Sequence, residues 1–159
     1  MKIKIIAVGS LKEQYLKDAA TEYRKRLGRF GKVEVFEVAE EKLSEKASDK
    51  MIENCLLREQ ENILKHISDS EYVIAMVIEG QMVTSEDFAM KISEIMVTGQ
   101  STITFVIGSS HGLGEEIKRR ANFNLSFSKM TFPHQLCRVM LLEQIYRAFK
   151  INNNEPYHK

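Results

Sequence analysis

Hydrophobic and polar residues follow two periods along the chain, one typical of strands and one typical of helices. Short apolar or alternating runs predict five strands, at Lys2–Val8 and at residues 33–38, 72–78, 103–107 and 124–128. Apolar residues at helical spacing predict helices at 13–27, 49–66, from Thr84–Ser85 onward, after the turn 108–114, and at 134–151. Strands that alternate with helices indicate an α/β fold with a mostly parallel sheet sandwiched by helices.

The predicted sheet suggests where a functional site lies. The strand at 72–78 is continuously apolar, as expected for a strand covered on both faces, and 103–107 (ITFVI) is predicted to be a second buried strand. In open parallel sheets, ligands bind in the crevice beyond the carboxyl ends of the strands. Three loops fall there, after Glu79, at 108–114 and at 129–133. We expect these loops to build the site.

The last predicted helix has an unusually wide apolar surface. Winding residues 136–151 at 100° per residue places Glu143, Arg147 and Lys150 in one polar stripe, opposite an apolar arc of roughly 200°. This width favours burial on two sides, by the sheet and by a second copy of the chain; a core helix in a monomer is the alternative. Arg138 projects from the arc, where a charge requires a carboxylate, a ligand or a polar seam between chains.

Length and composition narrow the class of protein. The chain has 159 residues, 43% apolar and 28% charged, which is ordinary for a single globular domain spanning residues 1–159. Its longest apolar run, 72–78, is far short of the about 20 residues that cross a bilayer. The first residues lack the pattern of a signal peptide. We therefore expect a cytoplasmic protein that does not bind membranes.

Charge and cysteine placement bear on partners and metals. The formal net charge is only +1, but basic residues concentrate at 12–32 and 118–159, and acidic ones at 37–61. This distribution is compatible with a basic face on an RNA-contacting enzyme, and equally with ordinary solvated helix faces. Cys55 and Cys137 are far apart and no histidine stands at ligand spacing from them, so we expect reduced cysteines and no metal site.

One motif points to a different chemistry. Residues 108–112 (GSSHG) match G-x-S-x-G, the nucleophile turn of α/β-hydrolases. Glu143 and His158 follow Ser110 in the chain order of a hydrolase triad. The chain is short for that fold and the pattern is common, so a serine hydrolase using Ser110 is the weaker hypothesis.

The carboxyl-terminal tail carries candidate chemistry. Asparagines at 152–154 tolerate the left-handed conformation that ends a helix, and Pro156 prevents its continuation. Tyr157, His158 and Lys159 then offer a phenol, an imidazole and an ammonium group to a nearby site. A disordered tail is the alternative.

Several segments together resemble the RlmH family, SPOUT-class methyltransferases of bacterial large-subunit rRNA. They are the opening K-I-x-x-x-A-V-G, the turn at 105–112, the stretch 125–146 (LSFSKMTFPHQLCRVMLLEQIY) and the terminal PYHK. The resemblance implies a homodimer with a carboxyl-terminal trefoil knot, in about residues 72–159, and S-adenosyl-L-methionine as methyl donor. It further implies that the acceptor is N3 of a pseudouridine in the helix 69 loop of 23S rRNA, free or in the ribosome.

The resemblance also implies site residues. The family's cofactor contacts map onto Met76, Gly108, Phe127, Ser128, Lys129, Met130, Thr131 and Phe132, which lie in the three loop regions chosen from the sheet or at the ends of the strands that precede them. This chain departs from the family at Ser109, where Gly is usual, and at His111, where an acidic or amide residue is usual. These departures leave the hydrogen bonding of the turn open.

The expected reaction assigns roles to the tail. The cofactor carries the methyl chemistry, and the protein must align donor and acceptor and exclude water. We expect His158 to act as base or proton relay, and Tyr157 to stack on or hydrogen-bond the flipped base. Arg147, Arg138 and Lys159 are expected to stabilise negative charge or hold phosphates. A non-catalytic ribosome-binding module is the remaining alternative.

Overall fold

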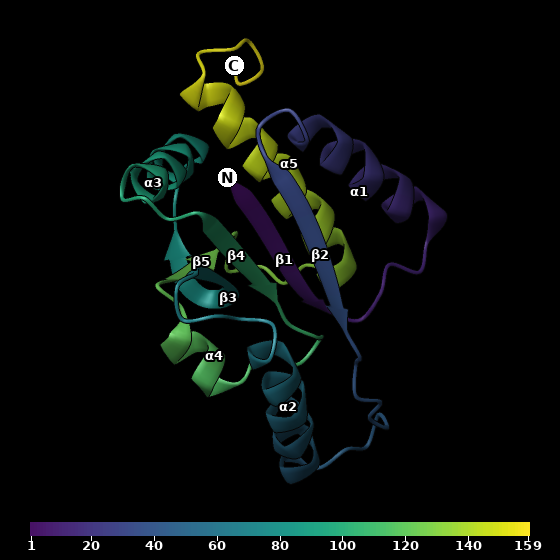
Figure 1. Cartoon of the computed structure of the whole chain (residues 1–159). Coiled ribbons are helices and arrows are strands. Elements are labelled where there is room, and N and C mark those ends of the chain that lie inside the picture. Colours follow the sequence, from purple (N-terminus) through teal and green to yellow (C-terminus); the bar gives the residue numbers. More distant parts are fainter.

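The computed structural model describes residues 1–159 and contains one sheet of five parallel strands. In the order β2-β1-β4-β3-β5, the strands are β2 (Lys32–Val38), β1 (Lys2–Val8), β4 (Thr102–Ile107), β3 (Tyr72–Met82) and β5 (Phe123–Ser126). The helices between and after them are α1 (Gln14–Leu27), α2 (Asp49–Leu64), α3 (Ser85–Val97), α4 (Glu115–Arg120) and α5 (His134–Asn152) (Figure 1). The predicted α/β class is confirmed, and every strand pairing is parallel.

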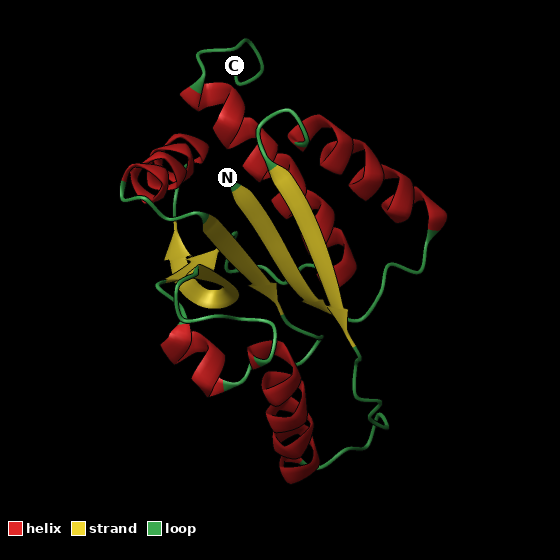
Figure 2. Ribbon diagram, in the orientation of Figure 1, coloured by secondary structure: helices red, strands yellow, loops and turns green.

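Helices cover both faces of the sheet, as predicted (Figure 2). Successive side chains of a strand point to opposite faces, so each strand contributes to two cores. Ile3 and Ile5 of β1 pack in a core with buried residues of α1, α3 and α5. Ile6 and Val8 of the same strand pack with Ile63 of α2 and with the α4 segment. No helix combines the length and the apolarity needed to cross a membrane.

Helix ends follow the predicted capping signals. The Ser48 hydroxyl accepts a hydrogen bond from the backbone N–H of Met51 at 3.3 Å at the start of α2. Thr84 and Asp87 form a reciprocal capping box at the start of α3. Asn154 adopts a left-handed φ of 53° just beyond α5, and thus turns the chain back at the predicted place.

Strand β3 runs four residues beyond the predicted end at Ile78, because its last part pairs with β5 across an irregularity. Leu125 pairs with Met76 before this irregularity and with Gln81 after it. A side chain at Gly80 would place its Cβ only 2.7 Å from the Asn124 carbonyl oxygen, so glycine allows the two backbones to approach. Residues 79–82 show no alternating pattern that would predict a strand. Their pairing partner lies more than 40 residues away, so the local sequence does not reveal it.

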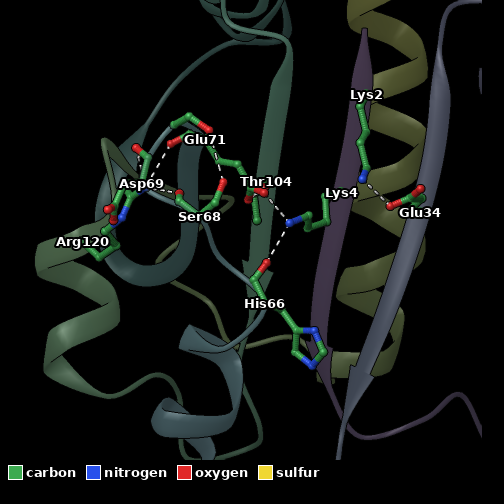
Figure 3. Close-up of polar contacts among 10 residues, drawn as sticks. Lys2, Lys4, Glu34, His66, Ser68, Asp69, Glu71, Thr104 and Arg120 are labelled. Carbon is green, nitrogen blue, oxygen red and sulfur yellow. Dashed lines mark hydrogen bonds and ion pairs between the residues drawn. The ribbon is translucent and has the colours of Figure 1, made fainter.

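A buried ion pair lies on the α2 side of the sheet (Figure 3). The Lys4 ammonium group contacts the Glu71 carboxylate and donates a hydrogen bond to the His66 carbonyl oxygen at 2.7 Å. The Thr104 hydroxyl donates to the other Glu71 oxygen at 2.6 Å. Arg120 donates to the Glu71 carbonyl oxygen at 3.1 Å. These bonds attach the loop between α2 and β3 to β1 and β4.

Candidate active site

A cavity of about 610 Å³ lies beyond the carboxyl ends of β3, β4 and β5. Met76 of β3 pairs with Ile107 of β4 and with Leu125 of β5, so the three strands deliver their following loops to one place. The walls come from the end of β3, the turn after β4 and the segment after β5. These are the three regions expected from the rule that ligands bind beyond the carboxyl ends of parallel strands. The volume suits a nucleoside-sized ligand.

The structure brings most of the expected cofactor residues together. Met76, Gly108 and all of 127–132 except Lys129 line this cavity. Lys129 is exposed outside it. The 126–130 loop is shaped by local hydrogen bonds, since Ser126 Oγ donates to the Ser128 carbonyl oxygen and Ser128 Oγ accepts from the Met130 N–H, both at 3.0 Å.

The glycines of the 108–112 turn are required by its geometry. A Cβ on Gly108 would lie 2.2 Å from the Gly112 carbonyl oxygen, and Gly112 has a φ of +89°. Ser109, the departure from the family pattern, is buried, and its hydroxyl donates to Glu59 of α2 at 2.9 Å. His111 is exposed at the mouth of the cavity. Of the two residues that depart from the family pattern, Ser109 thus has a defined hydrogen-bond partner in Glu59.

The serine hydrolase hypothesis is wrong. Ser110 is exposed and hydrogen-bonds to no histidine. The two ring nitrogens of His158 contact Arg147 and Glu86 instead, at the far end of α5. A triad requires the nucleophile, the base and the acid in hydrogen-bond reach of one another, and chain order alone does not supply that.

The tail folds back on α5 and forms a polar cluster there. Glu143 Oε1 accepts hydrogen bonds from Arg147 Nη2 at 2.6 Å, from Arg147 Nε at 3.0 Å and from the Tyr157 hydroxyl at 3.1 Å. The Arg147 guanidinium also lies 4.8 Å from the centre of the Tyr157 ring, and Arg147 Nη1 contacts His158 at 3.1 Å. The expected catalytic residues Arg147, Tyr157 and His158 are therefore close together.

The cluster sets the charge of its members. Burial raises the pKa of Tyr157, and the neighbouring Tyr23 and the Glu143 carboxylate raise it further, so the phenol keeps its proton. The hydrogen bond to Glu143 raises the pKa of Arg147. Sequence reasoning assigned Glu143 no part in methyl transfer; its spacing of four residues from Arg147 on one helix was the available signal.

Glu155 anchors the tail to the rest of the molecule. Its carboxylate contacts Lys150 of α5 and accepts a hydrogen bond from Arg29 at 2.6 Å. Its backbone N–H donates to the Lys150 carbonyl oxygen at 2.9 Å, which closes the turn at the left-handed Asn154. The tail is ordered against α5 by these contacts, contrary to the disordered alternative.

The tail cluster is separated from the cavity of the same chain. Figure 1 shows the carboxyl terminus on the side where β1 begins, whereas the cavity lies where the strands end. Along α5, ten residues separate Cys137, which lines the cavity, from Arg147, a rise of about 15 Å. A second cavity of about 530 Å³ lies between them; it includes Glu143 and shares Phe127 and Phe132 with the first.

The two residues expected to contact RNA have different environments. Arg138 is 3% exposed; its Nη1 donates to Glu37 Oε1 at 2.6 Å and its Nη2 to the Gly9 carbonyl oxygen at 2.9 Å. A carboxylate thus satisfies the charge, as one of the predicted solutions required, and contact with RNA would require this pair to open. Lys159 is exposed at the chain end.

Together, the parallel sheet and the cavity at its carboxyl edge define an α/β protein with room for a nucleoside-sized ligand. Residues 1–158 match the family model described as "Predicted SPOUT methyltransferase". The chain belongs to this family, and it is a methyltransferase. Its resemblance to such enzymes, inferred above from short segments, is confirmed.

Curated relatives and one solved structure are also similar to this chain. Proteins named "Ribosomal RNA large subunit methyltransferase H" are 58% identical in Bifidobacterium animalis subsp. lactis (strain AD011) and 55% identical in Clostridium botulinum (strain Kyoto / Type A2), each aligned over 100% of both chains. A solved "probable methylase family protein from Haemophilus influenzae Rd KW20" superposes with a TM-score of 0.56 at 17% identity, covering 99% of this chain and 70% of that one. This last similarity supports the fold alone.

Proposed function

We propose that this protein transfers a methyl group from S-adenosyl-L-methionine to large-subunit (23S) ribosomal RNA, in the cytoplasm. The observation that carries the proposal is the cavity formed by Met76, Gly108 and the 127–132 segment in a chain of the SPOUT methyltransferase family. The printed names of the relatives support the RNA substrate. The finer acceptor, N3 of a pseudouridine in the helix 69 loop, rests on the family resemblance.

The residues of the cavity fit this cofactor. Met76, Phe127 and Phe132 supply apolar walls for a flat base, and the lack of a side chain at Gly108 lets the turn approach closely. Burial raises the pKa of the Cys137 thiol to about 11, so this wall is uncharged too. The bound cofactor supplies an electrophilic methyl group, and the chain orients it and excludes water.

The tail cluster supplies groups for the RNA base. An imide nitrogen must lose its proton when it is methylated, and His158 is the group assigned to accept or relay that proton. Tyr157, a protonated phenol, donates to or stacks on the base. Glu143 positions Arg147 and Tyr157 by accepting from both. Arg147 keeps its positive charge to stabilise the deprotonated base.

A homodimer is needed to bring these groups together. Reacting atoms must approach to roughly 3–3.5 Å, but Arg147, which contacts His158 of the tail, lies about 15 Å along α5 from Cys137 in the cavity wall of the same chain. Apolar residues remain uncovered at the cavity, where Met130 is 71% exposed, and beside it at the start of α5, where Leu136 is 39% exposed. We infer that a second copy covers this surface and that its tail completes the cavity.

The experiment that tests the shared site mixes two inactive variants. His158→Ala removes the base from the tail, and Gly108→Val blocks the cavity with a side chain against Gly112. If tails and cavities pair between copies, random reassortment restores about one quarter of wild-type methylation, because half of the dimers hold one intact site of two. If each chain uses its own tail, mixing restores nothing and the shared site is refuted.

The substrate is tested in cells. Mass mapping of 23S rRNA from a strain lacking this protein is expected to show one missing methyl group, in the helix 69 loop. The wild-type gene should restore the modification, and the His158→Ala gene should not. An unchanged modification pattern would refute the proposal that 23S rRNA is the substrate. Loss of a methyl group at another nucleotide would show that the acceptor lies outside the helix 69 loop.

We also propose that residues 72–159 form the trefoil knot that the resemblance implies, within a single domain of residues 1–159. Its support is the close passage of segments distant in sequence. Gly80 allows the backbone of β3 to touch that of β5, and Leu125 pairs with β3 on both sides of the irregularity.

A further inference from the structure

Glu59 of α2 is a buried carboxylate that lines neither the cavity nor the tail cluster. It is only 2% exposed, yet both of its oxygens are occupied. Oε1 accepts a hydrogen bond from the Ser109 hydroxyl at 2.9 Å, and Oε2 accepts from the backbone N–H of Glu41 at 3.1 Å. Burying a carboxylate lowers the stability of the fold unless the carboxylate is hydrogen-bonded. Both hydrogen bonds therefore stabilise Glu59 in its buried position.

Ser109 connects this carboxylate to the cavity. It is 7% exposed and lies in the turn whose residues 107–113 line the cavity wall. Its backbone carbonyl accepts from the Gly112 N–H at 2.9 Å, which closes the turn. The hydroxyl of Ser109 therefore attaches the turn to α2, while its backbone carbonyl forms the hydrogen bond that closes the turn beside the cavity.

The next residue of α2 holds the other end of the same turn. Gln60 is 3% exposed, and its Oε1 accepts from the Glu116 N–H at 2.9 Å at the start of α4. Gln60 also packs against Gly114 so closely that a Cβ there would lie 2.3 Å from the amide oxygen. Two adjacent side chains of α2 thus support both ends of the 108–114 segment.

We propose that Glu59 is a positioning residue for cofactor binding, acting through Ser109 to fix the 108–112 turn against the ligand. The inference rests on the proposed function, since it takes this cavity as the S-adenosyl-L-methionine site. Glu59 does not reach the cavity itself, so its effect falls on affinity for the cofactor rather than on the reacting groups.

Ser109→Ala is the direct test, because it removes the donor and leaves a carboxylate oxygen of Glu59 unpaired. Calorimetry is expected to show the dissociation constant for S-adenosyl-L-methionine raised at least about fivefold, with kcat at saturating cofactor nearly unchanged. Glu59→Gln retains both contacts, since its amide oxygen can accept from Glu41 and its nitrogen can donate to Ser109. It should bind nearly as wild type, whereas Glu59→Ala should weaken binding like Ser109→Ala.

Thr104→Val is the matched control. Like Ser109, Thr104 donates its hydroxyl to a largely buried glutamate, Glu71, but it lies within β4 and does not line the cavity. Both variants are expected to lose comparable thermal stability, and only Ser109→Ala is expected to lose cofactor affinity. A double variant, Ser109→Ala with Glu59→Ala, should bind no worse than Glu59→Ala alone, since both remove one contact.

Different results would refute the positioning role of Glu59 and the proposed methyltransferase function. If wild-type protein binds the cofactor and Ser109→Ala binds equally well, the positioning role of Glu59 is refuted. Equal weakening in Thr104→Val refutes it too, because the effect would then follow general stability. If wild-type dimer binds no S-adenosyl-L-methionine at all, the proposed function itself fails, and this inference fails with it.

Discussion

Arg147 Nη1 lies 3.1 Å from His158 Nδ1, and this contact determines where the histidine carries its proton. An arginine nitrogen can only donate, so Nδ1 must accept and is unprotonated. In this arrangement Nε2 carries the ring proton and donates it to Glu86 Oε1 at 2.8 Å. Both nitrogens are occupied in the isolated chain, so His158 must leave Arg147 before Nδ1 can accept a proton from RNA.

Removal of residues 157–159 should abolish methylation without removing cofactor binding. No residue of 157–159 lines the cavity of its own chain, and the tail is assigned to the RNA base, so the affinity for S-adenosyl-L-methionine should stay close to that of wild type. Loss of a general base typically costs about 10² to 10⁴ in rate. Calorimetry and transfer of labelled methyl groups to ribosomes measure the two effects. His66→Ala serves as control, because the His66 ring packs at a tilt against Phe36, away from the tail. Normal methylation by the shortened protein would exclude the tail from catalysis.

Arg147→Met should weaken RNA engagement more than cofactor binding. The substitution removes the charge beside Tyr157 and both hydrogen bonds that Arg147 donates to Glu143. We expect the KM for ribosomal substrate to rise and the dissociation constant for the cofactor to stay the same. Steady-state kinetics with each substrate varied in turn measures this split. The reverse split would place Arg147 at the cofactor.

Gly108→Ala should impair cofactor binding by displacing the turn. The new Cβ would lie 2.2 Å from the Gly112 carbonyl oxygen, and overpacking of this kind costs about 1–3 kcal/mol of stability. Gly28→Ala is the control, because Gly28 has an ordinary helical φ of −55° and lies away from the cavity. Thermal unfolding and calorimetry should separate the two variants. Equal cofactor affinity in both would contradict a tight turn at Gly108.

Glu71→Gln should change how stability depends on pH. Burial raises the pKa of Glu71, but hydrogen bonds from Lys4 and Thr104 outweigh it and bring the pKa below the ordinary 4.5. A depressed pKa contributes stability above the ordinary value, and that stability is lost as pH falls through the folded pKa. Wild type should therefore exceed Glu71→Gln by about 2–4 kcal/mol near neutral pH, with the difference shrinking below pH 4.5.

The control for this measurement is Glu94→Gln. Glu94 pairs with Lys91 on α3, its side chain is 59% exposed, and surface pairs contribute little to stability. Denaturant unfolding at a series of pH values compares the three proteins. A pH-independent difference between wild type and Glu71→Gln would contradict the depressed pKa.

Arg138→Met should lower stability more than RNA affinity. Arg138 is 3% exposed and its charge is satisfied by Glu37 and the Gly9 carbonyl oxygen. Removing the guanidinium leaves both acceptors without their donor, which costs about 1–3 kcal/mol. Denaturant unfolding and filter binding of a 23S rRNA fragment measure the two quantities. A large loss of RNA affinity at unchanged stability would show that the pair opens for the substrate.

The sequence by itself determined the order of strands and helices, the parallel sheet and the region of the cavity. Periodicity of side chains reports local burial, and the carboxyl-end rule then groups loops such as those at Gly108 and Phe127. Capping residues such as Ser48 and Thr84 could be recognised because their bonds span only three residues. The family resemblance, carried mainly by residues 125–146, pointed to the methyltransferase class.

Only the tertiary structure decided which polar groups meet. Arg138 finds Glu37 and Ser109 finds Glu59 across many residues of chain, and a single polar side chain leaves no periodic signal of its partner. The same holds for the irregular pairing of β3 with Leu125. The separation of the tail from the cavity also depends on the length and direction of α5, which become informative only once the helix is packed against the sheet.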